Sequence, residues 1–353
     1  MMLATTSEHA NAAGALAGRW RQFRQENPKV RIRDAARALG TSEAELVATG
    51  CGSTAQRLRP EWTELLKALP ALGRVMALTR NEQCVHERHG AYLDVSVTGM
   101  MGLVLGPDID LRLFLSGWRH VFAVTEQTAH GERRSVQIFD QSGVAMHKVY
   151  ATVETDADAF TALVARFRHE DQRPTIVTEP APAPVVPRAD SEIDVAALRD
   201  GWGKLEDTHD FFGMLRRLKV ERTQAFRLAG PDFARPLRLN AARAVLEGAA
   251  ERAMPIMIFV GNRGCIQIHT GPVRRLVTTG PWLNVLDPDF NLHLREDGIA
   301  SAWLVRKPTR DGDVTSVEVF DAAGEPIAML LGKRKPGQPE DLAWRSFASG
   351  LAA

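Results

Sequence analysis

The sequence predicts an α+β protein built from two tandem copies of one unit, each combining a large antiparallel β-sheet with helices. Residues 19–70 place apolar side chains at helical spacing, whereas residues 72–150 alternate apolar and polar side chains with a period of two. A shift of 181 residues aligns the first half of the chain with the second. Self-similarity of this kind indicates a duplicated structural unit, and we expect the two copies to pack about a pseudo-twofold axis.

These patterns divide the chain into an N-terminal repeat at residues 19–172, a linker at 173–190 and a C-terminal repeat at 191–345. The linker sequence RPTIVTEPAPAPVVPRAD is rich in proline, which favours an extended, semi-rigid segment. We expect residues 1–18 to form a loose arm, because they lack both a basic start and a sustained apolar run. No apolar stretch approaches the length of a membrane span, so the protein is not expected to be embedded in a membrane.

The N-terminal helices allow two interpretations. Residues 31–50 superficially resemble a helix-turn-helix motif with Gly40 at the turn, which would indicate a DNA-binding regulator. A recognition helix should be basic or polar toward phosphate, but this one would carry Glu43 and Glu45. The alternative is a small helical subdomain in which Ser42 caps a helix and Glu45 is its partner.

The remaining elements follow in order along the chain. We expect short strands at Tyr92–Val97 and Ser135–Phe139, turns at 106–108 and 140–143, a helix at 156–170, a further helix from Ser191, and strands from 255 to 333.

The repeat keeps its turn residues in register over about sixty residues without a gap. The matched pairs include Asn81 with Asn262, Cys84 with Cys265, Gly99 with Gly280, Pro107 with Pro288, Gly131 with Gly312, and Gly143 with Gly324. Other positions differ between the copies: Arg112 becomes His293, Lys148 becomes Met329, Tyr150 becomes Leu331, and His86 becomes Gln267. A shared fold with unshared chemistry predicts one main site rather than two equal ones.

The segment DTHDFFGMLR, residues 207–216, reads as the start of a helix that Asp207 can cap. His209 would lie in the first turn, where the helix dipole disfavours a charged imidazole, and a neutral imidazole is what a metal ligand must be. Phe212, Gly213 and Arg216 share its face on a 3.6-residue period, which leaves room for a flat ligand such as an iron porphyrin. His209 could equally be an ordinary surface or core residue, and Phe212 could belong to the core.

Composition excludes several classes of function. The 44 basic and 43 acidic residues give a net charge of +1, which favours neither nucleic acid nor an anionic membrane as the main partner. The three cysteines, Cys51, Cys84 and Cys265, form no CxxC pair and suit a reducing, cytoplasmic compartment.

Longer motifs identify a resemblance. The segments MALTRNEQCVHE (76–87), GPDIDLRLF (106–114), LEDTHDFFGMLRR (205–217) and WLVRKPTRDGDVTSVEVFDAAGE (303–325) resemble the bacterial cytoplasmic haemin transport and degradation factors of the HemS/HmuS/ChuS type, as do residues 262–297 and 332–337. The resemblance covers about residues 20 to 345. It implies a duplicated antiparallel-sheet fold that binds one haem, iron protoporphyrin IX, in a cleft.

The resemblance also implies roles for individual residues. His209 matches the proximal iron ligand, Arg112 the distal arginine and Phe114 an aromatic residue over the porphyrin, while Lys307 and Arg334 match cations near the porphyrin edge. Lys307 and Arg334 could otherwise be solvated surface charges. Two departures, Met329 and Leu331, put contacts to the propionates from that edge in doubt, and His86 matches a second, weaker haem site in some members.

The resemblance implies a cytoplasmic haem-binding protein of iron acquisition that receives haem from an inner-membrane ABC transporter. It would either degrade haem oxidatively, with Arg112 and His209 serving the chemistry, or act as a chaperone that passes haem to an acceptor such as a haem oxygenase. The same pocket serves both fates. A DNA-binding regulator and a structural protein with an empty cleft are the alternatives from other classes.

Overall fold

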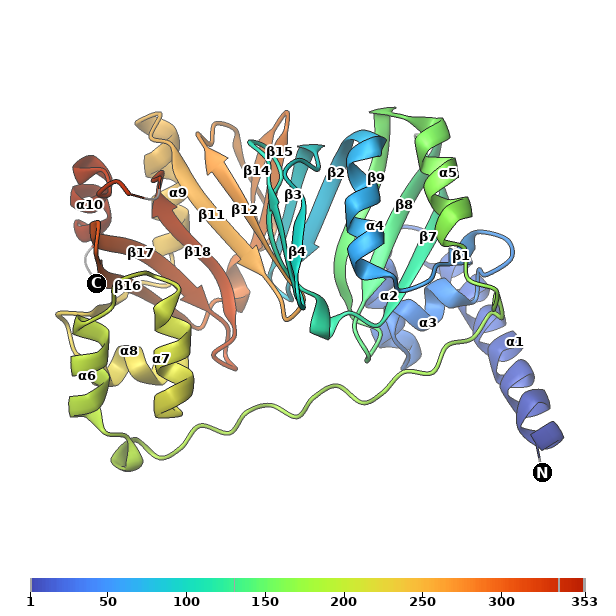
Figure 1. The fold of residues 1–353 in the computed structure, drawn as a ribbon, viewed down its shortest axis with the longest axis horizontal. Helices are drawn as coiled ribbons and strands as arrows, with labels where there is room; N and C mark the ends of the chain where they lie inside the picture. The colour runs from blue at the N-terminus through green and yellow to red at the C-terminus, as the bar shows by residue number, and fades with distance from the viewer. Residues whose placement is uncertain (1, 130, 336, 352–353) are drawn as a thin grey trace. The chain divides into compact units, whose positions relative to one another are not determined.

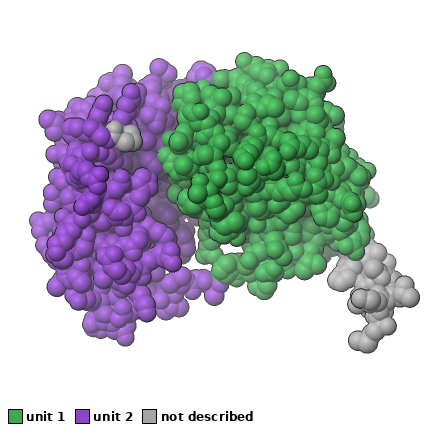
Figure 2. All heavy atoms as spheres, viewed as in Figure 1, with its two compact units in different colours: residues 1–79, 88–182, 262–266 green, residues 80–87, 183–261, 267–353 purple. Residues whose placement is uncertain are grey.

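The computed structural model describes residues 2–129, 131–335 and 337–351, which divide into two compact units (Figures 1 and 2). Unit 1 comprises Met1–Thr79, Arg88–Pro182 and Asn262–Ile266, and unit 2 comprises Arg80–Glu87, Ala183–Gly261 and Gln267–Ala353. Each unit thus takes most of one half of the sequence and a short segment of the other. Within the described part of the chain, no helix has the combination of length and apolarity that crossing a membrane requires.

Unit 1 contains an antiparallel array and a shorter meander. The array has the strand order β1 (Ala55–Arg57), β7 (His120–Thr128), β8 (Gly131–Phe139), β9 (Ala145–Thr155) and β2 (Gly73–Arg80). The meander pairs β4 (Ser96–Thr98), β5 (Met101–Leu105) and β6 (Asp110–Phe114), and β3 (Cys84–Ala91) begins in residues assigned to unit 2.

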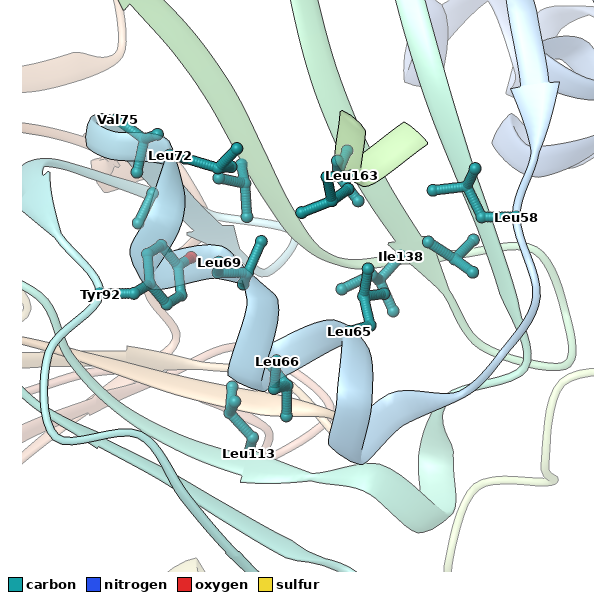
Figure 3. Close-up of a cluster of buried hydrophobic side chains, with 14 of the residues drawn as sticks. Leu58, Leu65, Leu66, Leu69, Leu72, Val75, Tyr92, Leu113, Ile138 and Leu163 are labelled. Atoms are coloured by element: carbon teal, nitrogen blue, oxygen red, sulfur yellow. The ribbon is translucent and has the colours of Figure 1, made fainter. Parts of the chain in front are cut away.

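The helices of unit 1 are α1 (Met2–Glu26), α2 (Ile32–Leu39), α3 (Glu43–Ala48), α4 (Trp62–Ala68) and α5 (Ala157–Phe167), with short 3-10 turns at Leu69–Leu72 and Leu115–Gly117. The main core of the unit joins α4 and α5 to the strands. Figure 3 shows Leu65 and Leu66 of α4 in this core with Leu113 of β6 and Ile138 of β8. All four side chains are at most 1% exposed, so the apolar face of the sheet is fully covered there.

Unit 2 repeats this plan. Its array has the order β10 (Ala234–Leu237), β16 (Ser301–Thr309), β17 (Gly312–Phe320), β18 (Pro326–Gly332) and β11 (Ile256–Gly261). Its meander pairs β13 (Leu276–Thr279), β14 (Trp282–Asp287) and β15 (Phe290–Arg295), and β12 is Cys265–Gly271. Its helices are α6 (Val195–Gly203), α7 (Asp210–Leu218), α8 (Arg222–Ala229), α9 (Ala241–Glu251) and α10 (Leu342–Ser349), with 3-10 turns at Asp190–Glu192 and Glu296–Gly298.

The structure confirms the tandem α+β repeat. A shift of 181 residues places β7 on β16 and β8 on β17, with no change in either boundary. It also superposes the turns: Asp140 and Asp321 each accept hydrogen bonds from backbone N–H groups two and four residues later. Gly143 and Gly324 close these turns at the same φ of 79°, a left-handed conformation that favours glycine.

Three local predictions need correction. Residues 2–26 form α1 rather than a loose arm up to residue 18. The run Tyr92–Val97 is not one strand, because Asp94 adopts a φ of 48° and pairing resumes only at β4. The helix-turn-helix interpretation is wrong: α3 is capped by Ser42 as the alternative predicted, but the helix is largely buried and the Glu43 carboxylate pairs with the buried Lys148. A recognition helix needs an exposed face for DNA.

Two matched asparagines, Asn81 and Asn262, stabilise the turns in which they lie. Asn81 comes from the first half of the sequence but belongs to unit 2, and Asn262 comes from the second half but belongs to unit 1. Asn81 Oδ1 accepts hydrogen bonds from the backbone N–H groups two and three residues later, and its amide donates to the carbonyl of Ile327 at 2.8 Å within unit 2. Asn262 repeats the pattern within unit 1, where its amide donates to the carbonyl of Met146 at 2.9 Å. The following cysteines, Cys84 and Cys265, are buried, as expected for matched core positions.

A buried polar cluster lies beside this turn in unit 1. The imidazole of His147 contacts the Tyr92 hydroxyl through Nε2 and the Thr79 hydroxyl through Nδ1 at 2.9 Å, and Thr79 Oγ1 lies 3.2 Å from Cys265 Sγ. All four side chains are at most 1% exposed. Burial lowers the pKa of His147 to about 3.

Acid should therefore destabilise the protein through His147. The unfolded chain takes up a proton below about pH 6.5, whereas the buried imidazole stays neutral, so the free energy of unfolding falls as the pH falls toward 3. This group contributes a loss of about 2 kcal/mol between about pH 6.5 and pH 5. Urea unfolding of the wild type and of His147→Gln, which keeps polar atoms but does not titrate, measures the difference. Equal pH slopes for the two proteins would contradict the prediction.

Candidate haem-binding site

His209 lies directly before α7, one residue outside the helix rather than in its first turn. Its side chain is 85% exposed. The carboxylate of Asp207 accepts a hydrogen bond from the His209 backbone N–H at 2.8 Å and contacts the ring nitrogen Nδ1 at 2.5 Å. The backbone N–H of Asp207 donates to Asp210 Oδ2 at 2.9 Å, so the loop entering the helix is held from both sides.

Helix α7 separates an apolar face from an open one. Phe211 is 1% exposed and packs against Trp202 of α6 at a ring-centroid distance of 4.5 Å. Phe212 is 64% exposed, and the guanidinium of Arg216 lies 5.9 Å from its ring. A Cβ at Gly213 would meet no atom within 4 Å. Phe212 and Gly213 therefore lie on an open face of α7, and the core residue of the Phe pair is Phe211.

The loop that carries His209 is anchored to the turn between β16 and β17. The backbone N–H of Arg310 donates to the Glu206 carbonyl at 2.9 Å, and its guanidinium pairs with the Glu206 carboxylate at 2.7 Å. The next residue, Asp311, lies 3.8 Å from Arg334 Nη2. Arg334 is partly buried, and among the described residues its Nε has no hydrogen-bond partner. Arg334 therefore contacts the β16–β17 turn through Asp311, and the same turn contacts the His209 loop through Arg310.

Lys307 lies beneath α7 and is not a solvated surface charge. It is 5% exposed, and its Nζ donates to Glu318 Oε1 at 2.9 Å and lies 4.9 Å from the ring of Phe211. Arg222 pairs with the other oxygen of Glu318 at 2.7 Å. Burial lowers the pKa of Lys307, and the charge of Arg222 acts in the same direction while Glu318 opposes it. Burial alone would raise the pKa of Glu318, but the two cations lower it to about 2.

The predicted residues of the first copy lie together in unit 1. Arg112 and Phe114 are partly exposed residues on one face of β6, and the alternating residues Leu111 and Leu113 are buried on the other face. The guanidinium of Arg112 pairs with Asp110, its neighbour on the same face. The strand period therefore placed Arg112 and Phe114 correctly relative to each other.

At the other positions where the two copies differ, the side chains are mostly buried or in contact with neighbouring side chains. His86 is fully buried, with its ring 5.0 Å from that of Phe290, so the imidazole is not on a surface that a second haem could reach. Leu331 is buried, and Met329 Sδ lies 3.8 Å from Arg222 Nη2. His293, the counterpart of Arg112, contacts Asn284 Oδ1 through Nδ1 at 2.7 Å.

Two contributions were missed from the sequence. Asp207 was expected only to cap the helix, yet it also contacts the imidazole ring. Arg310 was not singled out, although it anchors the loop. The Asp-x-His spacing of residues 207–209 was a visible signal for the contact between Asp207 and the imidazole. No sequence pattern links Arg310 with Glu206.

The side chains fit a flat, largely apolar ligand that carries a metal and an anionic edge. An imidazole with Nδ1 engaged by a carboxylate has Nε2 left for a metal, an exposed aromatic ring lies one turn along the helix, and arginine can grip carboxylates. The fold and this site define a class: duplicated α+β proteins whose second copy presents an exposed imidazole, that of His209, on the loop before α7.

Comparison with known proteins identifies the family. The family model described as the haemin-degrading HemS.ChuX domain matches residues 40–167 and again residues 219–351, and the chain belongs to this family. It is 43% identical over 333 residues to the hemin transport protein HmuS of Yersinia pestis, covering 94% of this chain and 95% of that protein. The resemblance seen in the sequence motifs is confirmed.

Two solved structures are similar over nearly the whole chain. The structure of holo-PhuS, a heme-binding protein from Pseudomonas aeruginosa, matches with a TM-score of 0.95 and 52% identity, covering 97% of this chain and 99% of that one. The heme-degrading enzyme ChuS of Escherichia coli O157:H7 matches with a TM-score of 0.90 and 39% identity, covering 97% and 100%.

Proposed function

We propose that this protein binds one haem through His209 and serves haem uptake and iron acquisition. The observation that carries the proposal is the exposed imidazole of His209, whose Nδ1 is engaged by Asp207 so that Nε2 is left for the iron. The names of its relatives support it, since HmuS is called a hemin transport protein and PhuS a heme-binding protein.

The remaining predicted residues would hold the cargo. The exposed ring of Phe212 offers an apolar surface on α7, the helix that follows the iron ligand. Arg334, with an Nε that lacks a partner among the described residues, suits a propionate. Lys307 would reach a propionate only by giving up its contact with Glu318, so we assign it to the support of α7 first.

Two fates of the bound haem are consistent with this site. Haem itself supplies redox chemistry when a reductant and oxygen are present, and the protein supplies binding and orientation. We propose that the protein acts in the cytoplasm, takes haem from an inner-membrane ABC transporter, and either opens the ring with release of iron or passes haem to an acceptor such as a haem oxygenase. ChuS is called a heme-degrading enzyme, which supports the first fate.

A haem titration followed by a turnover test decides between these outcomes. We expect a Soret band that saturates at one haem per chain, and no saturable band would overturn the proposal. The complex is then mixed with ascorbate in air, with catalase present because free peroxide destroys haem without an enzyme. Loss of the Soret band with absorbance of a ring-opened tetrapyrrole supports degradation. A stable band, with transfer to an added haem oxygenase, supports the chaperone function.

A further inference from the structure

Asp207 makes a contact that a helix cap does not need. Its Oδ1 accepts the hydrogen bond from the His209 backbone N–H and also lies 2.5 Å from Nδ1 of the same residue. We propose that Asp207 is a positioning residue that holds His209 in the tautomer with Nε2 free and makes this nitrogen a stronger donor to haem iron. The inference rests on the proposed function and deepens it.

The loop keeps the carboxylate in place. The backbone N–H of Asp207 is bound by Asp210, and the preceding residue Glu206 is tied to Arg310 through both main chain and side chain. A carboxylate that accepts the second ring N–H of a ligating histidine fixes the orientation of the ring and raises its basicity.

A purely structural role makes a different prediction. If Asp207 only orders the loop, an asparagine should replace it well, because its side-chain oxygen still accepts the His209 backbone N–H. Asparagine removes the negative charge next to Nδ1, whereas alanine removes the acceptor as well. The comparison of Asp207→Asn with Asp207→Ala therefore separates electrostatic support of the ring from support of the loop.

The experiment has one readout without haem and three with it. Nitrogen-15 NMR of the apo protein reports the tautomer of His209: we expect the proton on Nδ1 in the wild type and a shift of population toward Nε2 in Asp207→Asn. In the ferrous haem complex, the iron–histidine stretch should move to lower frequency and the midpoint potential to a more positive value in Asp207→Asn. Haem affinity should fall by about tenfold.

Asp200→Asn is the matched control. Asp200 lies on the neighbouring helix α6, is 62% exposed like Asp207, and pairs only with Lys204 among the contacts described for its carboxylate. This variant should leave the tautomer, the stretch, the potential and the affinity unchanged. The inference is overturned if haem binds through His209 and Asp207→Asn keeps the wild-type tautomer, stretch and potential. Failure of the wild type to bind haem, or binding that survives His209→Ala unchanged, overturns the proposed function instead.

Discussion

Replacing His209 by alanine is expected to weaken haem binding by at least about tenfold, since loss of a partner that merely supports a ligand already costs that much. The Soret maximum should move, because the iron loses its imidazole ligand. Stability should not change: the side chain is 85% exposed, and the hydrogen bond to Asp207 is its only described side-chain contact. Haem titration by absorbance, with thermal unfolding in parallel, measures both effects.

His169→Ala provides the control for His209→Ala. His169 lies after α5 in unit 1, and its Nδ1 accepts a hydrogen bond from the backbone N–H of Asp171 at 2.9 Å. Its removal should leave the spectrum and the affinity as in the wild type. If His209→Ala keeps the wild-type Soret maximum, another residue ligates the iron, and the assignment of the site to the α7 loop is wrong.

The duplication made much of the fold predictable. Turn residues carry strong local constraints, so Gly143 and Gly324 stayed in register with the aspartates that begin their turns. The exchange of residues 80–87 and 262–266 between the units was not predictable, because a period of two identifies a strand but not its partner. The matched asparagines at positions 81 and 262 were visible as a pair, but the carbonyls that they bind lie far away in the sequence.

Local spacing predicted the open face of α7, since Phe212, Gly213 and Arg216 follow from the helical period alone. It could not predict the burial of Lys307, which depends on an acid four residues beyond its cross-strand partner Val314 and on an arginine from α8. A lysine in an alternating strand reads as exposed until such partners are known. The face on which these helix residues lie was therefore predictable from local spacing, whereas the burial of Lys307, which depends on tertiary contacts, was not.

Replacing Glu318 by leucine is expected to cost about 3–5 kcal/mol of unfolding free energy, because it leaves a buried charge without its counter-ion. Glu318 is 2% exposed and accepts hydrogen bonds from Lys307, Arg222 and Ser316. Arg222 retains some contact with solvent, but the side chain of Lys307 is only 6% exposed. The ammonium group of Lys307 must then stay buried unpaired or lose its proton, so the variant should lose less stability at alkaline pH.

The double variant Glu318→Leu/Lys307→Met tests this explanation. It removes both the acid and the more deeply buried cation, so it should recover most of the stability lost by Glu318→Leu alone. Glu206→Gln, which breaks the exposed pair with Arg310, should cost less than about 1 kcal/mol. Urea unfolding at neutral and alkaline pH measures all three variants. The explanation is contradicted if Glu318→Leu is as stable as the wild type. It is also contradicted if Glu318→Leu/Lys307→Met is as unstable as Glu318→Leu, because the loss would then not come from the unpaired charge of Lys307.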